Sequence, residues 1–235
     1  MSQLILPLGS NPRHTFANFC TDGNEGILDA LESLPRQGGS LWLHGPQDSG
    51  KTHLLQAVCH QAKAREESAA YLPLKQMREL GPETLDGLEQ CLWICLDDVD
   101  AVLEQSDWQQ RLFGLANQAM DHGASLLMAA RQPAESVSVE LPDLRSRLRG
   151  AVSFPLQPLD DERQSEALRR RARSQGYDLP EDAVRYMQRH VVRGLGQLCQ
   201  LLDQLEQASL SQQRRITVPF VREVLAQPPT SESRL

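Results

Sequence analysis

The stretch that decides the fold is SLWLHGPQDSGKTHLLQAV, residues 40–58. Its apolar residues Leu41–Leu43 predict a short buried strand, and the apolar positions Leu54 and Val58 follow the period of a helix. Between them lies the pattern G-x-x-x-x-G-K-T, residues 45–52. The order of strand, glycine-rich loop and helix is that of a phosphate-binding loop, whose backbone N–H groups and helix N-terminus form an anion site.

The side chains of this loop have separate chemical tasks in such a site. Lys51 is expected to contact the β- and γ-phosphates of a nucleotide, and Thr52 is expected to bind Mg²⁺. The glycines allow the backbone to close around the phosphates. The predicted ligands are therefore ADP or ATP with Mg²⁺, and the alternative is a glycine-rich turn that binds nothing. The residues predicted to bind the nucleotide here are Gly45, Pro46, Asp48, Ser49, Gly50, Lys51, Thr52 and His53.

A second apolar run, CLWICLDDVD at residues 91–100, contains two adjacent carboxylates. It predicts a buried strand of a parallel sheet, and ligands bind at the carboxyl ends of such strands. We expect Asp97 to hold Mg²⁺ through water and Asp98 to polarise the attacking water of a hydrolysis reaction. The alternative is an exposed acidic turn.

Three more segments have the character of strands: ESAAYLPL at residues 67–74, ASLLMAARQP at 124–133 and AVSFPL at 151–156. Helical patterns lie between them. Alternating strands and helices predict an α/β fold, a parallel sheet of about five strands with helices on both faces.

After Pro158 the pattern is helical only, and it predicts a small all-helical domain. The expected helices are Asp160–Gln175, Pro180–His190, Leu195–Leu210 and Pro219–Ala226. The last nine residues, QPPTSESRL, have the composition of a disordered tail. We therefore predict an α/β nucleotide-binding domain at 11–157 and a helical domain at 158–226, with tails at 1–10 and 227–235.

Composition limits the classes of function. The longest clear apolar run falls short of the roughly 20 residues that cross a bilayer, and a net charge of −7 argues against a broadly basic nucleic-acid surface. Five cysteines without a CxxC pair and without a secretory signal indicate reduced thiols in the cytoplasm. The histidines and cysteines lack the spacing of a metal-ligand set, although His53 and His60 lie on one predicted helix.

The chain begins with an apolar stretch, QLILPL at residues 3–8. Pro7 interrupts the run, and the absence of a basic residue before Gln3 argues against an export signal. Residues 9–12, GSNP, read as a loop that separates the stretch from the fold. The sequence leaves open an edge strand or a binding peptide.

Beyond these motifs, the chain resembles the AAA+ ATPases, and among them the DnaA family of replication initiators. HTFANF at residues 14–19, followed by Asn24, is similar to the linker on the adenine side of DnaA, and DLRSRL at 143–148 is similar to its arginine-finger segment. VVRGLGQL at 191–198 resembles the lid segment with the second sensor arginine. The likeness covers about residues 11–226. It implies an AAA+ fold with a helical lid, with Phe16 and Arg193 at the nucleotide and Arg147 as an arginine finger.

The resemblance is closest to DnaA homologues that consist of an AAA+ module alone. DnaA itself has a further C-terminal domain for its origin boxes, and we expect this chain to lack that mode of DNA binding. The homologues carry an N-terminal hexapeptide of the type QL-x-LPL, which binds the DNA sliding clamp, the polymerase III β subunit. The resemblance thus implies clamp binding through Gln3, Leu4, Leu6, Pro7 and Leu8.

The function implied is negative regulation of replication initiation. Tethered to the clamp, the chain would supply Arg147 in trans to stimulate hydrolysis of ATP bound to DnaA. DNA would be met only through the clamp. Met128, Ala129 and Ala130 replace polar residues that orient water in DnaA, so we expect weak or absent intrinsic turnover. The alternative is a self-sufficient AAA+ ATPase, such as a helicase loader or clamp-loader subunit.

The segment ERQSEALRRRARSQ, residues 162–175, is rich in arginine. Helical spacing cannot place all its arginines on one face, so we expect a generally solvated helix. A contact to DNA or to the partner is the alternative. The sequence also leaves open whether the chain is a monomer or a homo-oligomer.

Overall fold

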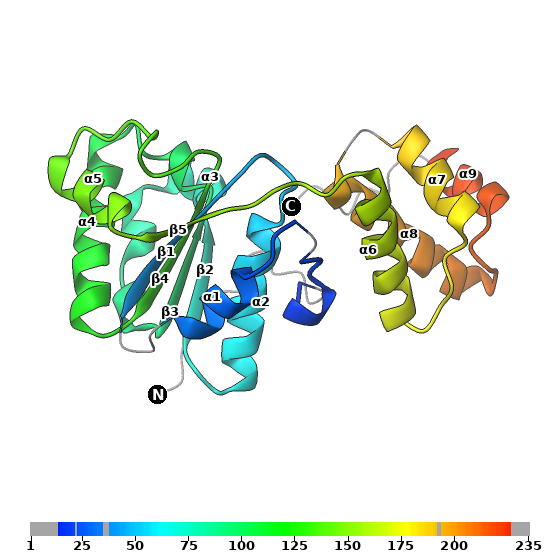
Figure 1. The fold of residues 1–235 in the computed structure, drawn as a ribbon, viewed down its shortest axis with the longest axis horizontal. Coiled ribbons are helices and arrows are strands. Elements are labelled where there is room, and N and C mark those ends of the chain that lie inside the picture. The colour runs from blue at the N-terminus through cyan, green and yellow to red at the C-terminus, as the bar shows by residue number, and fades with distance from the viewer. Residues whose placement is uncertain (1–13, 22, 35–37, 192–193, 227–235) are drawn as a thin grey trace. The chain divides into compact units, whose positions relative to one another are not determined.

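The structure is a computed structural model that describes four stretches of the chain: residues 14–21, 23–34, 38–191 and 194–226. The chain divides into two compact units, Met1–Pro158 and Leu159–Leu235, which Figure 1 shows as a sheet with helices and a group of helices. The predicted clamp-binding peptide, Arg193 and the last nine residues lie outside the described residues.

The first unit is built on a five-stranded sheet in which every pairing is parallel. The strand order is β2-β3-β4-β1-β5, so β1 lies between β4 and β5. The strands are β1 (Gly39–His44), β2 (Ala69–Pro73), β3 (Trp93–Asp97), β4 (Ser125–Ala130) and β5 (Val152–Pro155). This sheet confirms the predicted α/β fold.

Helices cover both faces of the sheet, as Figure 1 shows. Side chains alternate along each strand, so Leu41 and Leu43 pack in one apolar cluster while Trp42 packs in another. The first cluster includes side chains of α1 (Ile27–Ser33) and α2 (Lys51–Ala64). The second includes side chains of α3 (Leu74–Met77), α4 (Ser106–Asp121) and α5 (Pro142–Arg149).

Short 3₁₀ turns complete this unit: η1 (Phe16–Asn18), η2 (Arg78–Leu80), η3 (Pro82–Leu85), η4 (Leu88–Gln90) and η5 (Val99–Ala101). Two of them matter for the site. η1 belongs to the segment before α1, and η5 follows the carboxyl end of β3.

The second unit contains α6 (Asp161–Ser174), α7 (Glu181–His190), α8 (Leu195–Gln212) and α9 (Val218–Ala226). The Asp160 side chain accepts a hydrogen bond from Arg163 N at 2.9 Å and caps α6. Apolar residues of the four helices, among them Leu168, Met187, Leu202 and Phe220, form one buried cluster. An all-helical unit was predicted at this place in the chain.

One expectation for α6 is wrong. Arg171 is not solvated but only 7% exposed, and its Nη2 lies 2.9 and 3.0 Å from the two carboxylate oxygens of Asp203 on α8. The reason is that Arg171 lies on the face of α6 that packs against α8, next to buried Leu168 and Ala172. Arg163, Arg169 and Arg173 instead pair within their own helix or its cap.

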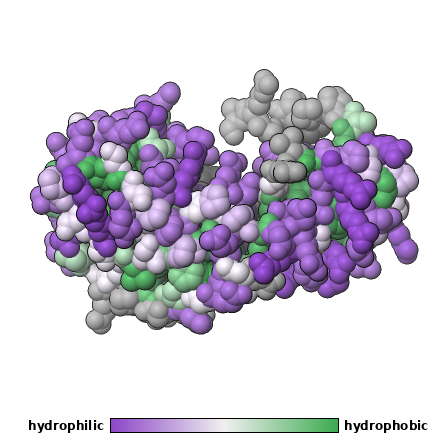
Figure 2. Space-filling model, turned by 45° about the horizontal axis from the view of Figure 1, so that its top comes forward, coloured by the Kyte–Doolittle hydropathy of each residue, from purple (hydrophilic) through white to green (hydrophobic). Residues whose placement is uncertain are grey.

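The five cysteines, all within the described residues, form no disulfide bonds, and Cys20, Cys91 and Cys95 are buried. None of the helices among the described residues is long and apolar enough to cross a membrane. Figure 2 shows hydrophilic residues over much of the visible surface, and the large apolar side chains that are exposed in the described part are Leu80, Leu92, Met120, Val152, Leu210 and Leu225.

Candidate functional site

The loop between β1 and α2 has a backbone that only glycine can follow at its first position. Gly45 has φ of 156°, and a Cβ placed there would lie 2.2 Å from the backbone oxygen of Leu156. At the other end of the loop, Gly50 has φ of 94° immediately before α2. The sequence G-x-x-x-x-G-K-T therefore forms a tight turn that ends at a helix N-terminus, the geometry of an anion site.

Lys51 lies inside this loop. Its ammonium Nζ donates hydrogen bonds to the backbone oxygens of Gly45 and Pro46, at 2.8 and 2.6 Å, and to Ser49 Oγ at 3.3 Å. Burial lowers the pKa of Lys51, and the nearby carboxylates Asp97 and Asp98 act in the opposite direction. The loop thus holds a positive charge where phosphate oxygens would sit.

Thr52 and Asp97 meet at the carboxyl end of β3. Thr52 Oγ1 donates to Asp97 Oδ2 at 2.6 Å, and the backbone N–H of Asp98 donates to Asp97 Oδ1 at 3.0 Å. Thr52 is exposed whereas Asp97 is buried. An exposed hydroxyl beside a carboxylate fits Mg²⁺, which prefers oxygen ligands and takes others from water and phosphates. Among the described residues, no group of three or more His, Cys, Asp or Glu side chains could hold a metal ion by itself.

Asp98 has an uncommon backbone conformation and a raised pKa. Its φ of 52° lies in the left-handed region, which is uncommon for a residue other than glycine. Burial raises the pKa of Asp98, and the charges of Asp97 and Asp100 raise it further, although Lys75 and Lys51 act against them. A carboxylate with a raised pKa is suited to accept a proton or a hydrogen bond from water.

The segment around η1 lies against α2. His14 stacks on His53 with ring centroids 4.7 Å apart, and His53 Nε2 donates to the backbone oxygen of Thr15 at 2.8 Å. Phe16 is half-buried and packs against the same apolar cluster as α2. Sequence prediction placed Phe16 and His53 together at the nucleotide, and the structure brings both segments beside the loop.

Asn24 fixes the other end of this segment. Its Nδ2 donates to the backbone oxygen of Gln157 at 3.0 Å, and the N–H of Gln157 donates to Asn24 Oδ1 at 2.7 Å. This pair joins the segment before α1 to the chain that follows β5. The sequence offered no direct signal for the contact, because the two residues are far apart along the chain.

Sequence reasoning missed one polar neighbour of Asp97. The hydroxyl of Tyr71, on β2, donates to Asp97 Oδ2 at 2.9 Å. The parallel register pairs Tyr71 with Cys95, two residues before Asp97, so only the register reveals the contact. Burial is the main cause that raises the pKa of the Tyr71 phenol, with Asp97 as the next cause. The hydroxyl therefore stays protonated as a donor.

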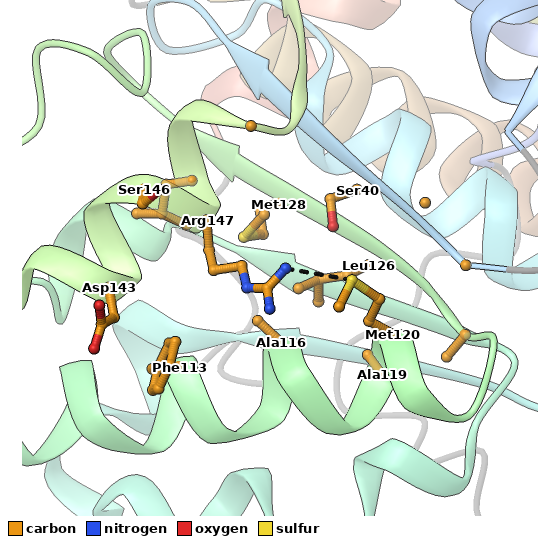
Figure 3. Close-up of a pocket in the computed structure, with 15 residues that line it drawn as sticks. Ser40, Phe113, Ala116, Ala119, Met120, Leu126, Met128, Asp143, Ser146 and Arg147 are labelled. Carbon is orange, nitrogen blue, oxygen red and sulfur yellow. Dashed lines mark hydrogen bonds between the residues drawn. The ribbon is translucent and has the colours of Figure 1, made fainter.

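Arg147 lies in a different place. Figure 3 shows its side chain reaching from α5 toward Met120 on α4, where its Nη1 lies 3.3 Å from Sδ. The surrounding cavity of about 500 Å³ also involves Gly38 and Ser40 at the start of β1. The phosphate loop follows the other end of β1, a strand of six residues that spans about 20 Å. Arg147 therefore does not join the loop residues of its own chain.

The end of β4 carries no polar side chain. Met128, Ala129 and Ala130 are buried, and the backbone oxygen of Ala130 accepts a hydrogen bond from the N–H of Gly45 at 3.3 Å. The strand thus ends directly beside the phosphate loop, but methyl groups at this position cannot orient a water molecule. The weak turnover expected from the sequence stays a prediction.

The fold is an AAA+ fold similar to that of solved DnaA structures. The structure is similar to domain III of DnaA from Thermotoga maritima, with a TM-score of 0.72 at 20% identity over 92% of this chain and 96% of that one. It is also similar to AMPPCP-bound DnaA from Aquifex aeolicus, with a TM-score of 0.66 at 20% identity over 87% and 68%. The Thermotoga maritima RuvB branch migration motor gives 0.51 at 15% identity over 80% and 61%.

The helical unit matches one protein family. Residues 160–225 match the family model described as Hda, lid domain. This match and the fold agree with the resemblance drawn from the sequence: the helical unit is similar to the lid domain of Hda, and the chain has a fold similar to that of DnaA domain III.

Proposed function

We propose that this chain regulates replication by supplying Arg147 in trans to ATP bound on the initiator DnaA. The observation that carries the proposal is the position of the Arg147 side chain, which extends from α5 near the start of β1 and away from the chain's own phosphate loop. A guanidinium placed there cannot act on a nucleotide held at Gly45–Thr52 of the same chain. An arginine supplied in trans stabilises the charge on the transferring phosphoryl group and is worth about 10³- to 10⁵-fold in rate.

The chain's own nucleotide has a supporting role in this proposal. Lys51, Thr52 and Asp97 would hold ADP or ATP with Mg²⁺, and Phe16 and Arg193 would contact the nucleotide from the linker and the lid. Asp98 would polarise a water molecule, but Ala129 and Ala130 leave that water without a second partner, so intrinsic hydrolysis would be slow. Lys51→Ala should abolish binding of a fluorescent ADP, whereas Lys63→Ala, in the last turn of α2, should leave it unchanged.

The proposed tether to the DNA sliding clamp rests on sequence alone. Gln3, Leu4, Leu6, Pro7 and Leu8 match a clamp-binding hexapeptide. Burying Leu6 and Leu8 would contribute about 1.5–3 kcal/mol each, a small sum for a tight complex. The contact gains effect because a clamp on DNA concentrates its partners, so that the second contact becomes intramolecular.

A variant that lacks the tether should stimulate hydrolysis poorly at low protein concentration but not at high protein concentration. Gln3→Ala combined with Leu6→Ala should lose retention on immobilised clamp and should lower stimulated hydrolysis at limiting protein. A large excess of the variant should restore hydrolysis, since only the local concentration has fallen. Equal retention of this variant and the wild type on the clamp would refute the tether.

One observation favours a second function, that of a self-sufficient ATPase. Asp98, with its raised pKa, stands beside the Thr52–Asp97 pair as a water-polarising carboxylate would. A steady-state assay of the isolated chain separates the two. Turnover at the usual rate of enzymes, about 1–10³ s⁻¹, without DnaA would favour the self-sufficient ATPase.

A further inference from the structure

Three polar side chains lie buried together between α2 and the strands β2 and β3. Gln56, Tyr71 and Asp97 are 3%, 7% and 3% exposed, beside a face of the sheet that is mostly apolar. Buried polar groups cost stability unless they are hydrogen-bonded. Their mutual hydrogen bonds therefore matter for this part of the fold.

These side chains form a series of hydrogen bonds in which each donor points toward Asp97. A carboxylate only accepts hydrogen bonds, so Tyr71 must donate to Asp97 Oδ2, at 2.9 Å. A hydrogen bond with the Gln56 side chain acts to lower the pKa of the Tyr71 phenol, which is the effect of a donor, so the Gln56 amide donates to the phenol oxygen. This leaves Gln56 Oε1 to accept from Nδ1–H of His14, at 2.8 Å. Each of these three contacts pairs one donor with one acceptor.

This series of hydrogen bonds ends at Asp97 Oδ2, the atom that Thr52 also contacts. Asp97 Oδ2 accepts from Thr52 Oγ1 at 2.6 Å as well as from Tyr71. A metal ion would bind a lone pair of the Thr52 oxygen, and any rotation of the hydroxyl that this requires would weaken its hydrogen bond to Asp97. Tyr71 then remains to fix the orientation of the carboxylate, because the Gln56 contact holds the phenol in place.

The other end of the chain lies in the segment that precedes α1. His14 stacks on His53, and its backbone oxygen accepts from His60 Nδ1 at 2.7 Å. Displacement of this segment from α2 would remove the donor of Gln56 Oε1. A change in the segment would therefore reach Asp97 through two side chains.

We propose that Tyr71 is a positioning residue for Asp97. The hydrogen bonds from His14 through Gln56 to Tyr71 then couple the N-terminal segment to the Mg²⁺ side of the nucleotide site. The inference rests on the proposed binding of a nucleotide with Mg²⁺. It adds to that proposal a residue outside the phosphate loop and a route by which the segment before α1 adjusts metal affinity.

The test is a titration of the full chain with a fluorescent ADP, once with Mg²⁺ and once with EDTA. The quantity compared is the factor by which Mg²⁺ tightens binding. Tyr71→Phe keeps the ring and removes the hydroxyl, so this factor should fall about tenfold, the usual effect of losing an outer partner of a metal ligand. Binding in EDTA should not change. Tyr186→Phe, on α7 in the helical unit, serves as the matched control and should keep the wild-type factor.

The coupling is tested by a double-mutant cycle. His14→Phe keeps a ring for stacking on His53 but removes Nδ1, and it should lower the same factor by a smaller amount. Tyr71→Phe with His14→Phe should be no worse than Tyr71→Phe alone, because both changes interrupt one chain. Additive effects would refute the coupling of the segment to Asp97.

The outcomes are distinct. An unchanged factor in Tyr71→Phe, or an equal loss of affinity with Mg²⁺ and with EDTA, would refute the positioning role. If Tyr71→Phe does not fold, as judged by its thermal melt, Gln56→Met removes the support of the phenol and should lower the factor instead. A wild-type chain that binds ADP in neither buffer would refute the proposed nucleotide site and this inference with it.

Discussion

The guanidinium of Arg147 and the thioether of Met120 lie 3.3 Å apart across the cavity between α5 and α4. Sulfur is a weak acceptor, and both residues are exposed, so the contact costs little to break. A finger that acts on a partner must leave such a contact. The Arg147 side chain can therefore readily leave Met120 and extend away from α4.

Met120→Leu tests how much this contact matters. A neutral hydrogen bond contributes about 1 kcal/mol, and one to sulfur contributes less, so stimulated hydrolysis of DnaA-bound ATP should change less than about fivefold. The assay measures phosphate release from ATP-loaded DnaA with clamp on DNA. A loss as large as that of Arg147→Ala would make Met120 part of the finger's machinery.

Asp98→Asn should stabilise the protein at neutral pH. The folded pKa of Asp98 is raised, mainly by burial and next by the charge of Asp97. The wild type therefore loses stability as pH rises from the unfolded pKa, about 3.9, through the raised folded pKa. The amide variant escapes this loss.

Urea unfolding at a series of pH values measures the effect. The difference between Asp98→Asn and wild type should be largest above the folded pKa and should shrink toward acidic pH. A pH-independent difference for Asp98→Asn would contradict the raised pKa.

The ion pair of Arg171 and Asp203 should stabilise the helical unit. Arg171→Met removes the buried guanidinium that bonds the Asp203 carboxylate, which should lower the free energy of unfolding by about 2–3 kcal/mol. Arg170→Met, at the exposed neighbouring position, should change it by less than about 0.5 kcal/mol. Circular dichroism during urea unfolding follows both variants. Equal stability of the two would contradict the burial of Arg171.

The sequence predicted those features whose signal is local. The strand, the glycine loop and the helix are contiguous in residues 40–58, and Asp97 directly ends an apolar run, so the phosphate loop and its acid follow from short patterns. The five strands were predictable for the same reason. The bounds of the four helices after Pro158 differ from the predicted bounds by only a few residues.

The features that sequence analysis missed depend on tertiary contacts. Tyr71 lies 26 residues before Asp97, and Arg171 lies 32 residues before Asp203, so neither contact shows in a local pattern. Strand register decides the first and helix packing decides the second. The position of Arg147 relative to the loop likewise required the sheet order, since β1 separates the two sites.

The most direct test of the central claim is a titration of ATP-loaded DnaA, with clamp on DNA, by three forms of this chain. Arg149→Ala, in the same last turn of α5, is the matched control and should stimulate hydrolysis like wild type. Arg147→Ala should give at least about a 10³-fold lower stimulated rate at saturation, while it keeps binding to clamp and ADP, because no concentration replaces lost charge stabilisation in the transition state. An Arg147→Ala protein that matches wild type at saturation would contradict the trans-acting finger.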